Sequence, residues 1–497
     1  MKATMILFLL LAVAILSGCD VFGTSARLLP AEEPDGAVQD GGDAGLDGDT
    51  AQDDGAAPDA GDPGQDGHDA GADPGPQADD GGPDGGADDG GFVSHDCDLS
   101  TTPFDILEYK FEVDPKIATL VAMTPGDFDT DDRIDIALAG TKDATHLLSL
   151  LKNLSISNEI DFTSIEYLPI DKPLALASFN LGGSDRDALD DLALLSATPS
   201  QPYPSIKLNV WKSDTDNGLV ELKNSPFDIG QFPMLSALLK PGCFGQDEAI
   251  DLFVSSCGSF MPSFQQIYLW DGQTMSVAST ASLQGPVMAL AVFDLDGNGR
   301  DDLVVAKAAG NSPPPTANEI HIGLATKGDA EGIFDWTLMK SFTGETFLAL
   351  AVADLSGDNI PDLVAAVNST SGNTQIRWWK GQVDTSGNWK GFSPTFSSLI
   401  LPELFTTFKL QIADLDGDRR ADVIGLAPYS SQYFFFRNNS QGSGITLTNL
   451  YFQNVSGNDP TYDFFIRDMN HDGRPDLVFA CSGSLTGRLL FYLNQCR

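Results

Sequence analysis

Basic residues are scarce in this chain of 497 residues, which has 28 Lys and Arg against 71 Asp and Glu. The formal net charge of −43 leaves no basic surface for a phosphate backbone, so we expect no nucleic-acid partner. Histidine is also rare: five copies, no HExxH motif and no His cluster argue against a zinc hydrolase. GxSxG, P-loop and strand-borne GxGxxG motifs are missing too, which leaves enzymatic activity open but favours a non-catalytic protein.

Long hydrophobic runs are missing except at the start of the chain. Lys2 precedes an apolar segment over Met5–Leu16, which is 12 residues long and too short to span a bilayer comfortably. It ends in Leu16-Ser17-Gly18-Cys19, which resembles a bacterial lipoprotein lipobox. The resemblance implies a signal peptide over 1–18, lipidation of Cys19 and a lipid anchor in a membrane of the bacterial cell envelope, facing the periplasm or the cell surface. An ordinary signal peptide or an uncleaved anchor is the alternative.

Large apolar residues are nearly missing from the segment that follows. Residues 30–98 hold 21 Asp and Glu and no Lys or Arg, and Asp, Gly, Ala and Pro dominate. Such a segment cannot bury enough surface to offset the cost of ordering its backbone. We therefore expect residues 19–97 to be a disordered tether and residues 98–497 to fold.

Glycine and proline, by contrast, are plentiful, with 50 and 29 copies, and favour a turn-rich β fold. An Asp-rich loop recurs in the folded region, each time between two apolar strands. The aspartates that close its seven copies are Asp135, Asp191, Asp251, Asp302, Asp362, Asp422 and Asp476. Their spacing of 51–60 residues is typical of a propeller blade.

The fourth unit shows how each copy divides into four strands. We expect them over 287–293, 302–306, 319–324 and 334–338. The seventh unit has three such strands, whereas a spare strand over 104–113 precedes the first unit. The sequence thus predicts an all-β, seven-bladed β-propeller of four-stranded blades, in which the N-terminal strand joins the last blade and closes the ring.

The loops carry oxygen side chains at positions 1, 3, 5 and 9, which can converge on one cation such as calcium. They resemble FG-GAP/VCBS repeats, the calcium-loop repeats of integrin-α-type propellers. The resemblance implies about five to six structural calcium ions. The implied ligands are Asp127, Asp129, Asp131 and Asp135; Asp185, Asp187 and Asp191; Asp294, Asp296, Asn298 and Asp302; Asp354, Ser356, Asp358 and Asp362; Asp414, Asp416, Asp418 and Asp422; and Asp468, Asn470, Asp472 and Asp476. The second loop lacks the first acid, and the third keeps too few ligands to be assigned; metal-free Asx turns are the alternative.

Cysteine pairing follows from the expected topology. Cys496 ends the last strand, and Cys97 precedes the spare strand that should pair with it antiparallel. We therefore predict a Cys97–Cys496 disulfide. Cys243, Cys257 and Cys481 receive no partner and are expected to be buried.

These features favour a membrane-anchored, calcium-binding propeller that acts as a non-catalytic adhesion or ligand-recognition module for a protein or glycan. Two alternatives remain open. One is a carbohydrate-active enzyme that resembles propeller polysaccharide lyases, whose dispersed catalytic residues leave no local motif. The other is a cell-envelope scaffold with a protein partner. Fold resemblance alone does not identify the ligand.

Overall fold

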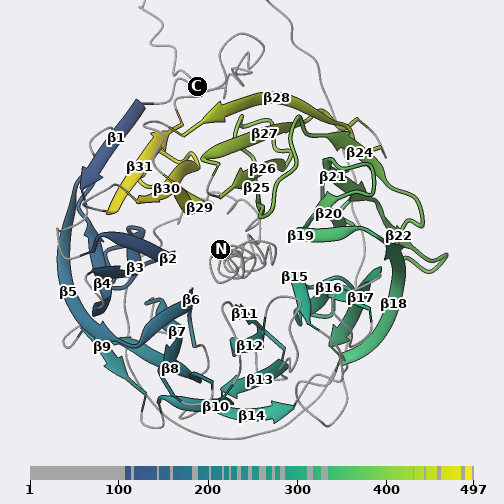
Figure 1. Ribbon diagram of the computed structural model, residues 1–497. Helices are drawn as coiled ribbons and strands as arrows, with labels where there is room; N and C mark the ends of the chain where they lie inside the picture. The colour runs from purple at the N-terminus through teal and green to yellow at the C-terminus, as the bar shows by residue number, and fades with distance from the viewer. Residues whose placement is uncertain are drawn as a thin grey trace, which may run out of the picture. The chain divides into compact units, whose positions relative to one another are not determined.

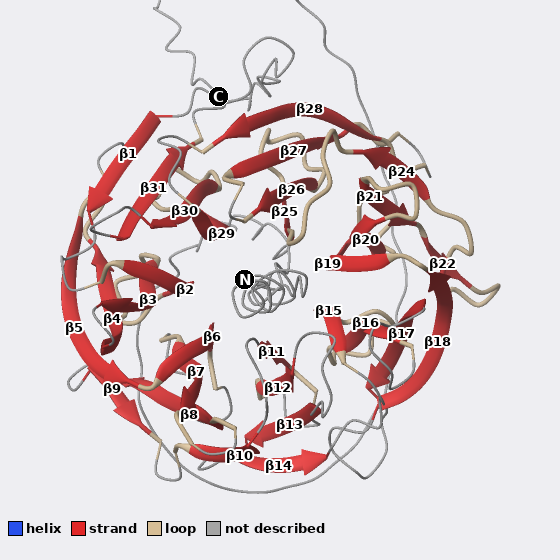
Figure 2. Cartoon of the chain, in the orientation of Figure 1, coloured by secondary structure: helices blue, strands red, loops and turns tan. Residues whose placement is uncertain are grey.

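Antiparallel strands joined by loops build the part of the chain that the computed structural model describes (Figure 2). This part comprises residues 107–112, 117–142, 145–156, 160–181, 189–200, 203–214, 218–222, 225–231, 237–244, 249–256, 265–270, 275–279, 286–309, 317–325, 334–428, 430–441, 444–455, 460–482 and 487–494. Within these ranges, no helix is long and apolar enough to cross a membrane.

The strands follow one another into successive sheets, which we number from the first to the seventh (Figure 1). The first sheet contains β2 (Thr119–Gly126), β3 (Asp135–Lys142), β4 (Thr145–Asn153) and β5 (Phe162–Ile170). The second contains β6 (Lys172–Phe179), β7 (Asp191–Thr198), β8 (Ser205–Asp214) and β10 (Phe227–Gln231), with β9 (Gly218–Glu221) beside β8. The third contains β11 (Ala237–Gly242), β12 (Asp251–Ser256), β13 (Gln265–Trp270) and β14 (Met275–Ser279). The fourth sheet contains β15 (Val287–Phe293), β16 (Asp302–Ala308), β17 (Ala317–Ala325) and β18 (Phe334–Thr343). The fifth contains β19 (Thr346–Ala353), β20 (Asp362–Asn368), β21 (Thr374–Trp379) and β24 (Ser397–Ile400). Between β21 and β24 the chain forms a hairpin of β22 (Gly381–Val383) and β23 (Trp389–Phe392). The sixth is β25 (Lys409–Ala413), β26 (Asp422–Ala427), β27 (Gln432–Asn438) and β28 (Leu447–Asn454).

The seventh sheet combines strands from both ends of the described chain. It contains β29 (Thr461–Arg467), β30 (Asp476–Ser482), β31 (Gly487–Leu493) and β1 (Leu107–Glu112), with β1 antiparallel to β31. Residue 107 lies opposite 493 and residue 112 opposite 488. The spare strand expected over 104–113 thus occurs as β1, on the edge of the sheet where the sequence predicted it.

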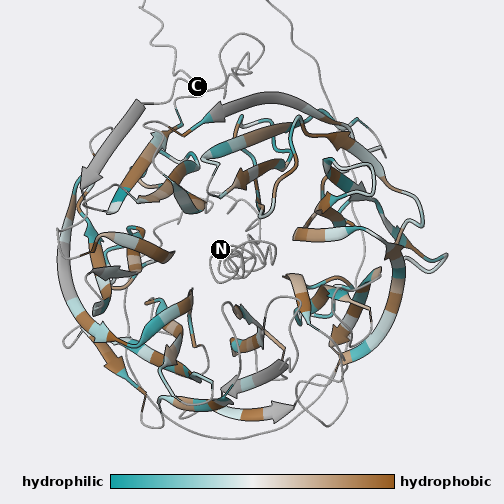
Figure 3. Ribbon diagram, in the orientation of Figure 1, coloured by the Kyte–Doolittle hydropathy of each residue, from teal (hydrophilic) through white to brown (hydrophobic). Residues whose placement is uncertain are grey.

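Burial explains why the second strand of a sheet is mostly apolar. Every residue of β16 is buried, as is every residue of β30, because neighbouring sheets cover both faces. The four strands expected in the fourth unit appear as β15 to β18. Figure 3 shows the resulting hydrophobic stretches along the inner strands.

The core is divided into hydrophobic clusters that each join two consecutive sheets. One further cluster joins the seventh sheet to the first, where the rings of Phe162 and Phe491 stack 5.3 Å apart. Each buried Phe contributes roughly 1.5–3 kcal/mol. The packing between sheets therefore stabilises this arrangement and fixes where the Asp-rich loops lie.

Candidate metal centres

An Asp-rich loop joins the first strand of a sheet to the second, and we call it the Asp loop of that sheet. Position 1 is its first Asp and position 9 is the Asp that opens the second strand. The five complete loops span 127–135, 294–302, 354–362, 414–422 and 468–476 and belong to the first, fourth, fifth, sixth and seventh sheets. They are referred to below as loops 1, 4, 5, 6 and 7.

The backbone of the loop curves around the carboxylate at position 1, which accepts several of its N–H groups. In loop 1, Asp127 Oδ1 accepts hydrogen bonds from the backbone N–H groups of Asp129 at 3.2 Å and Thr130 at 2.9 Å. Its Oδ2 accepts a third from Asp132 at 3.1 Å. Left-handed residues turn the chain at positions 4 and 6, with φ of 66° at Thr130 and 59° at Asp132. The same positions are left-handed in the other complete loops, at Gly297 and Gly299, Gly357 and Asn359, Gly417 and Arg419, and His471 and Gly473. This conformation explains the glycines of the motif.

The Asp at position 9 braces the loop against two strands. Asp302 is 0 % exposed. Its Oδ2 accepts the N–H of Leu295 at 2.8 Å, and its Oδ1 accepts that of Ala325 at 2.6 Å. A buried N–H that lost its acceptor would be costly, so this carboxylate has a structural role besides any metal.

The second sheet keeps this brace in an incomplete Asp loop. Asp191 Oδ2 accepts the N–H of Leu181 at 2.8 Å, and Oδ1 accepts that of Ser213 at 2.9 Å. The sequence predicted metal binding for Asp191 and gave no expectation of this bracing role. A signal was present, because the third loop keeps Asp251 although two of its four ligand positions carry other residues.

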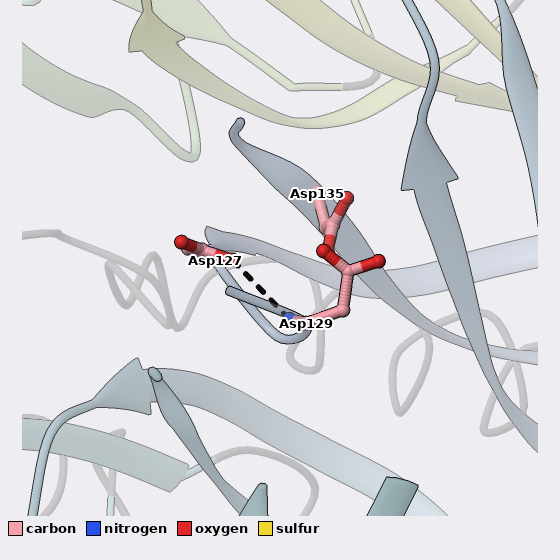
Figure 4. Close-up of side chains that lie close together, drawn as sticks. All are labelled: Asp127, Asp129 and Asp135. Atoms are coloured by element: carbon pink, nitrogen blue, oxygen red, sulfur yellow. Dashed lines mark hydrogen bonds between the residues drawn. The ribbon is translucent and has the colours of Figure 1, made fainter. Parts of the chain in front are cut away.

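Carboxylate oxygens from positions 1, 3 and 9 converge in three of the loops, where they lie within 4.8 Å of one another. In loop 1 these are Asp127, Asp129 and Asp135 (Figure 4). The corresponding groups in loops 4 and 6 are Asp294, Asp296 and Asp302, and Asp414, Asp416 and Asp422. Several hard oxygen donors at this separation fit a cation such as calcium.

The other predicted ligands lie around these groups. The side chains at position 5 turn back onto the loop and accept the N–H of position 7 through Asp131, Asn298, Asp358, Asp418 and Asp472. Loops 5 and 7 carry Ser356 and Asn470 at position 3, so positions 1, 3 and 9 offer two carboxylates in these loops instead of three. Cys243 and Cys481 are buried as expected. Asp185, Asp187, Cys19, Cys97 and Cys496 lie outside the described residues.

Burial changes the protonation of the position 9 aspartates. Desolvation raises the pKa of Asp135, Asp302 and Asp476 to about 7 and that of Asp362 to about 6. It also raises the pKa of Asp422 well above its usual value. Nearby carboxylates of the same loop add to each increase by repulsion. A cation between the carboxylates would reverse this effect, as expected for a metal loop.

Basic side chains from the third strand or the residue directly after it contact three of the loops. Lys152 donates a hydrogen bond to Asp129 in loop 1. Lys380 Nζ lies 2.9 Å from Asp358 Oδ2 in loop 5. In loop 6, the Nε of Arg437 lies 2.7 Å from Oδ2 of Asp416. These contacts were not predicted from the sequence.

Side-chain amides tie loops 5, 6 and 7 to the sheet that follows each of them, with the first sheet following the seventh. Asn438 Nδ2, in the sixth sheet, donates to the carbonyl oxygen of Leu355 in loop 5 at 2.8 Å. Asn494 reaches loop 6 in the same way, and Asn153 of the first sheet reaches Met469 of loop 7 at 2.9 Å. Neighbouring loops therefore lie side by side at one end of the sheets.

Repeated antiparallel sheets with Asp loops at one end define a β-propeller built from loop-bearing repeats. Residues 354–425 and 414–479 match the family model of the FG-GAP-like repeat, and these ranges include loops 5, 6 and 7. No curated protein matches the sequence.

Two solved structures illustrate what the chain is similar to. BBS1N in complex with ARL6DN is 10% identical, with a TM-score of 0.46 over 79% of this chain and 98% of that chain. Chaetomium thermophilum Polycomb Repressive Complex 2 bound to GSK126 is 10% identical, with a TM-score of 0.47 over 78% of this chain and 98% of that chain.

Proposed function

We propose that residues 98–497 form a calcium-stabilised, seven-bladed β-propeller that serves as a non-catalytic adhesion or ligand-recognition module. The observation that carries this proposal is the convergence of oxygen ligands in Asp loops at equivalent places in successive sheets. A module that binds a protein or glycan would use the loops at one end of the ring, where exposed side chains vary without disturbing the core.

Two contacts support a closed ring. The pairing of β1 with β31 provides the seventh sheet with a fourth strand. The cluster around Phe162 and Phe491 packs this sheet against the first. In a closed ring, these contacts would remove the open edge that a linear array of sheets exposes.

Calcium would act on the loops as a structural ion. Bound calcium would neutralise the converging carboxylates and hold the first strand against the second. The residues that would hold it in loop 4 are Asp294, Asp296, Asn298 and Asp302. A ligand that binds only the folded state raises its stability by mass action.

The lipobox-like start of the sequence supports a location of this module in the bacterial cell envelope. Cys19 would carry the lipid anchor, and residues 19–97 would hold the propeller away from the membrane. A chain of about 79 residues spans on the order of 50 Å, and repulsion between its acidic groups extends it further.

Thermal unfolding and metal counting test the proposal on the chain from residue 19 with Cys19→Ser, which avoids lipidation. We expect calcium, but not magnesium, to raise the unfolding midpoint above its value in chelator, with ions retained after dialysis. Binding is then measured on glycan and envelope-protein arrays with and without calcium. Absence of bound metal would contradict the calcium role, and turnover of a bound glycan would favour the enzyme alternative.

A further inference from the structure

Equivalent positions beside the complete Asp loops carry two different kinds of side chain. In each of these sheets, one N–H at the end of the third strand or up to two residues beyond it donates to Oδ1 of the position 9 Asp. We call the residue immediately before that donor the flanking residue. The flanking residues of loops 1, 5 and 6 are Lys152, Lys380 and Arg437, and those of loops 4 and 7 are Leu324 and Leu493.

The three basic flanking residues reach carboxylates that the calcium prediction assigns to metal. Lys152 hydrogen-bonds Asp129 and lies 3.3 Å from Asp131, which are positions 3 and 5 of loop 1. Lys380 reaches position 5 of loop 5 at 2.9 Å. The cationic nitrogens therefore lie beside the carboxylates that would coordinate a metal ion.

Loop 6 has the most enclosed of these ion pairs. The side chain of Asp416 is 1% exposed and that of Arg437 20%, with 2.7 Å between Oδ2 and Nε. Arg437 also approaches Asp418 to 3.8 Å. The guanidinium thus meets positions 3 and 5 together, and a second cation there would be repelled.

Loops 4 and 7 have no charge at the flanking position; in loop 7 the guanidinium of Arg474, at position 7 of the loop itself, lies 4.0 Å from Asp472 Oδ2. Leu324 and Leu493 are uncharged and cannot neutralise a carboxylate. In loop 4 the oxygens of Asp294, Asp296 and Asp302 still lie within 4.8 Å of one another. A cation from solution between these oxygens would offset their mutual repulsion.

We propose that the flanking residue divides the Asp loops into two classes. In loops 1, 5 and 6 the ammonium or guanidinium group replaces calcium, whereas loops 4 and 7 bind it. The second sheet has Lys212 at the flanking position, but residues 182–188 of its Asp loop lie outside the described part of the chain, so the division is drawn for the five complete loops. This inference rests on the proposed calcium role, but it predicts two tightly bound ions instead of five to six.

Calcium titration calorimetry with metal counting tests the division on the chain from residue 19 with Cys19→Ser. We expect two ions in the parent chain. Lys152→Leu, Lys380→Leu and Arg437→Leu should each add one ion, with affinity at that loop rising at least tenfold. Leu324→Lys and Leu493→Lys should each remove one.

Lys207→Leu is the matched control, because Lys207 is a third-strand lysine in an ion pair with Asp171 at 3.6 Å, away from position 9. It should leave two ions. Unfolding in chelator verifies that each variant folds. If the new lysine in Leu324→Lys or Leu493→Lys disrupts folding, the three variants that replace a basic residue with Leu at loops 1, 5 and 6 decide the question. Five ions of equal affinity in the parent, or an unchanged count in all three Leu variants at loops 1, 5 and 6, would overturn the division. No calcium in any variant would overturn the calcium role as well.

Discussion

Asp191 allows the bracing role of the position 9 Asp to be tested apart from metal binding. Its two oxygens accept N–H groups of Leu181 and Ser213, and its loop lacks an acid at position 1. Asp191→Ala should lower the free energy of unfolding by about 2–5 kcal/mol, because two buried donors lose their acceptor. Urea unfolding in chelator measures the loss. Asp191→Asn keeps one acceptor and should lose less; a neutral Asp191→Ala variant would show that the carboxylate braces nothing.

The raised pKa values of the position 9 aspartates predict how stability depends on pH. The pKa of Asp135, Asp302 and Asp476 is about 7 in the folded chain, while an unfolded Asp titrates near about 3.9. Between these values the folded state binds more protons than the unfolded state. The metal-free protein should therefore be most stable below about pH 4 with respect to these groups, and lose that stability as pH rises to about 7.

Denaturant unfolding in chelator from pH 4.5 to 8 measures this loss. Asp302→Asn removes one of the titrating groups and should flatten the profile, which separates Asp302 from the general repulsion of an acidic chain. Calcium should stabilise more at pH 7.5 than at pH 5, because it competes with protons for the same oxygens. A metal-free profile that rises between pH 5 and 7 would contradict the raised pKa values.

At the scale of elements, the sequence predicted what is encoded locally. Apolar runs and the nine-residue loop spacing located β15 to β18, and the surplus strand before the first repeat located β1. Contacts that depend on strand register were missed. Lys152 lies 17 residues beyond Asp135, and only the pairing of β3 with β4 brings it back to the loop. A recurrent Asn directly after the flanking residue, at 153, 438 and 494, is a signal that could have pointed to this position.

Asn438 illustrates how one strand end connects two sheets. Its Nδ2 donates to carbonyl oxygens of Leu355 in the fifth sheet and Ala421 in the sixth, at 2.8 and 2.9 Å. Asn438→Ala should lower the free energy of unfolding by about 1–3 kcal/mol, since buried carbonyl groups lose their donor. The adjacent Asn439 provides the control, because its Nδ2 donates an exposed hydrogen bond to Thr448 Oγ1. Asn439→Ala should change the free energy of unfolding by less than about 0.5 kcal/mol. Equal effects of both variants would show that the bond between sheets adds no stability.

For the whole molecule, the decisive contact joins residues nearly four hundred positions apart. The seven-sheet arrangement proposed above depends on β1, which pairs with β31 along its length from residue 107 to residue 112. A chain that begins at residue 117 would leave the edge of β31 unpaired. It should lose roughly 1 kcal/mol for each missing ladder hydrogen bond and gain a tendency to associate through that edge. The matched chain begins at residue 99 and retains β1. Thermal unfolding and light scattering compare the two, in calcium and in chelator. We expect a lower midpoint and soluble oligomers for the shorter chain in both conditions, because calcium in the loops cannot replace a missing strand. Identical midpoints and two monomeric proteins would show that the sheets hold together without closure by β1.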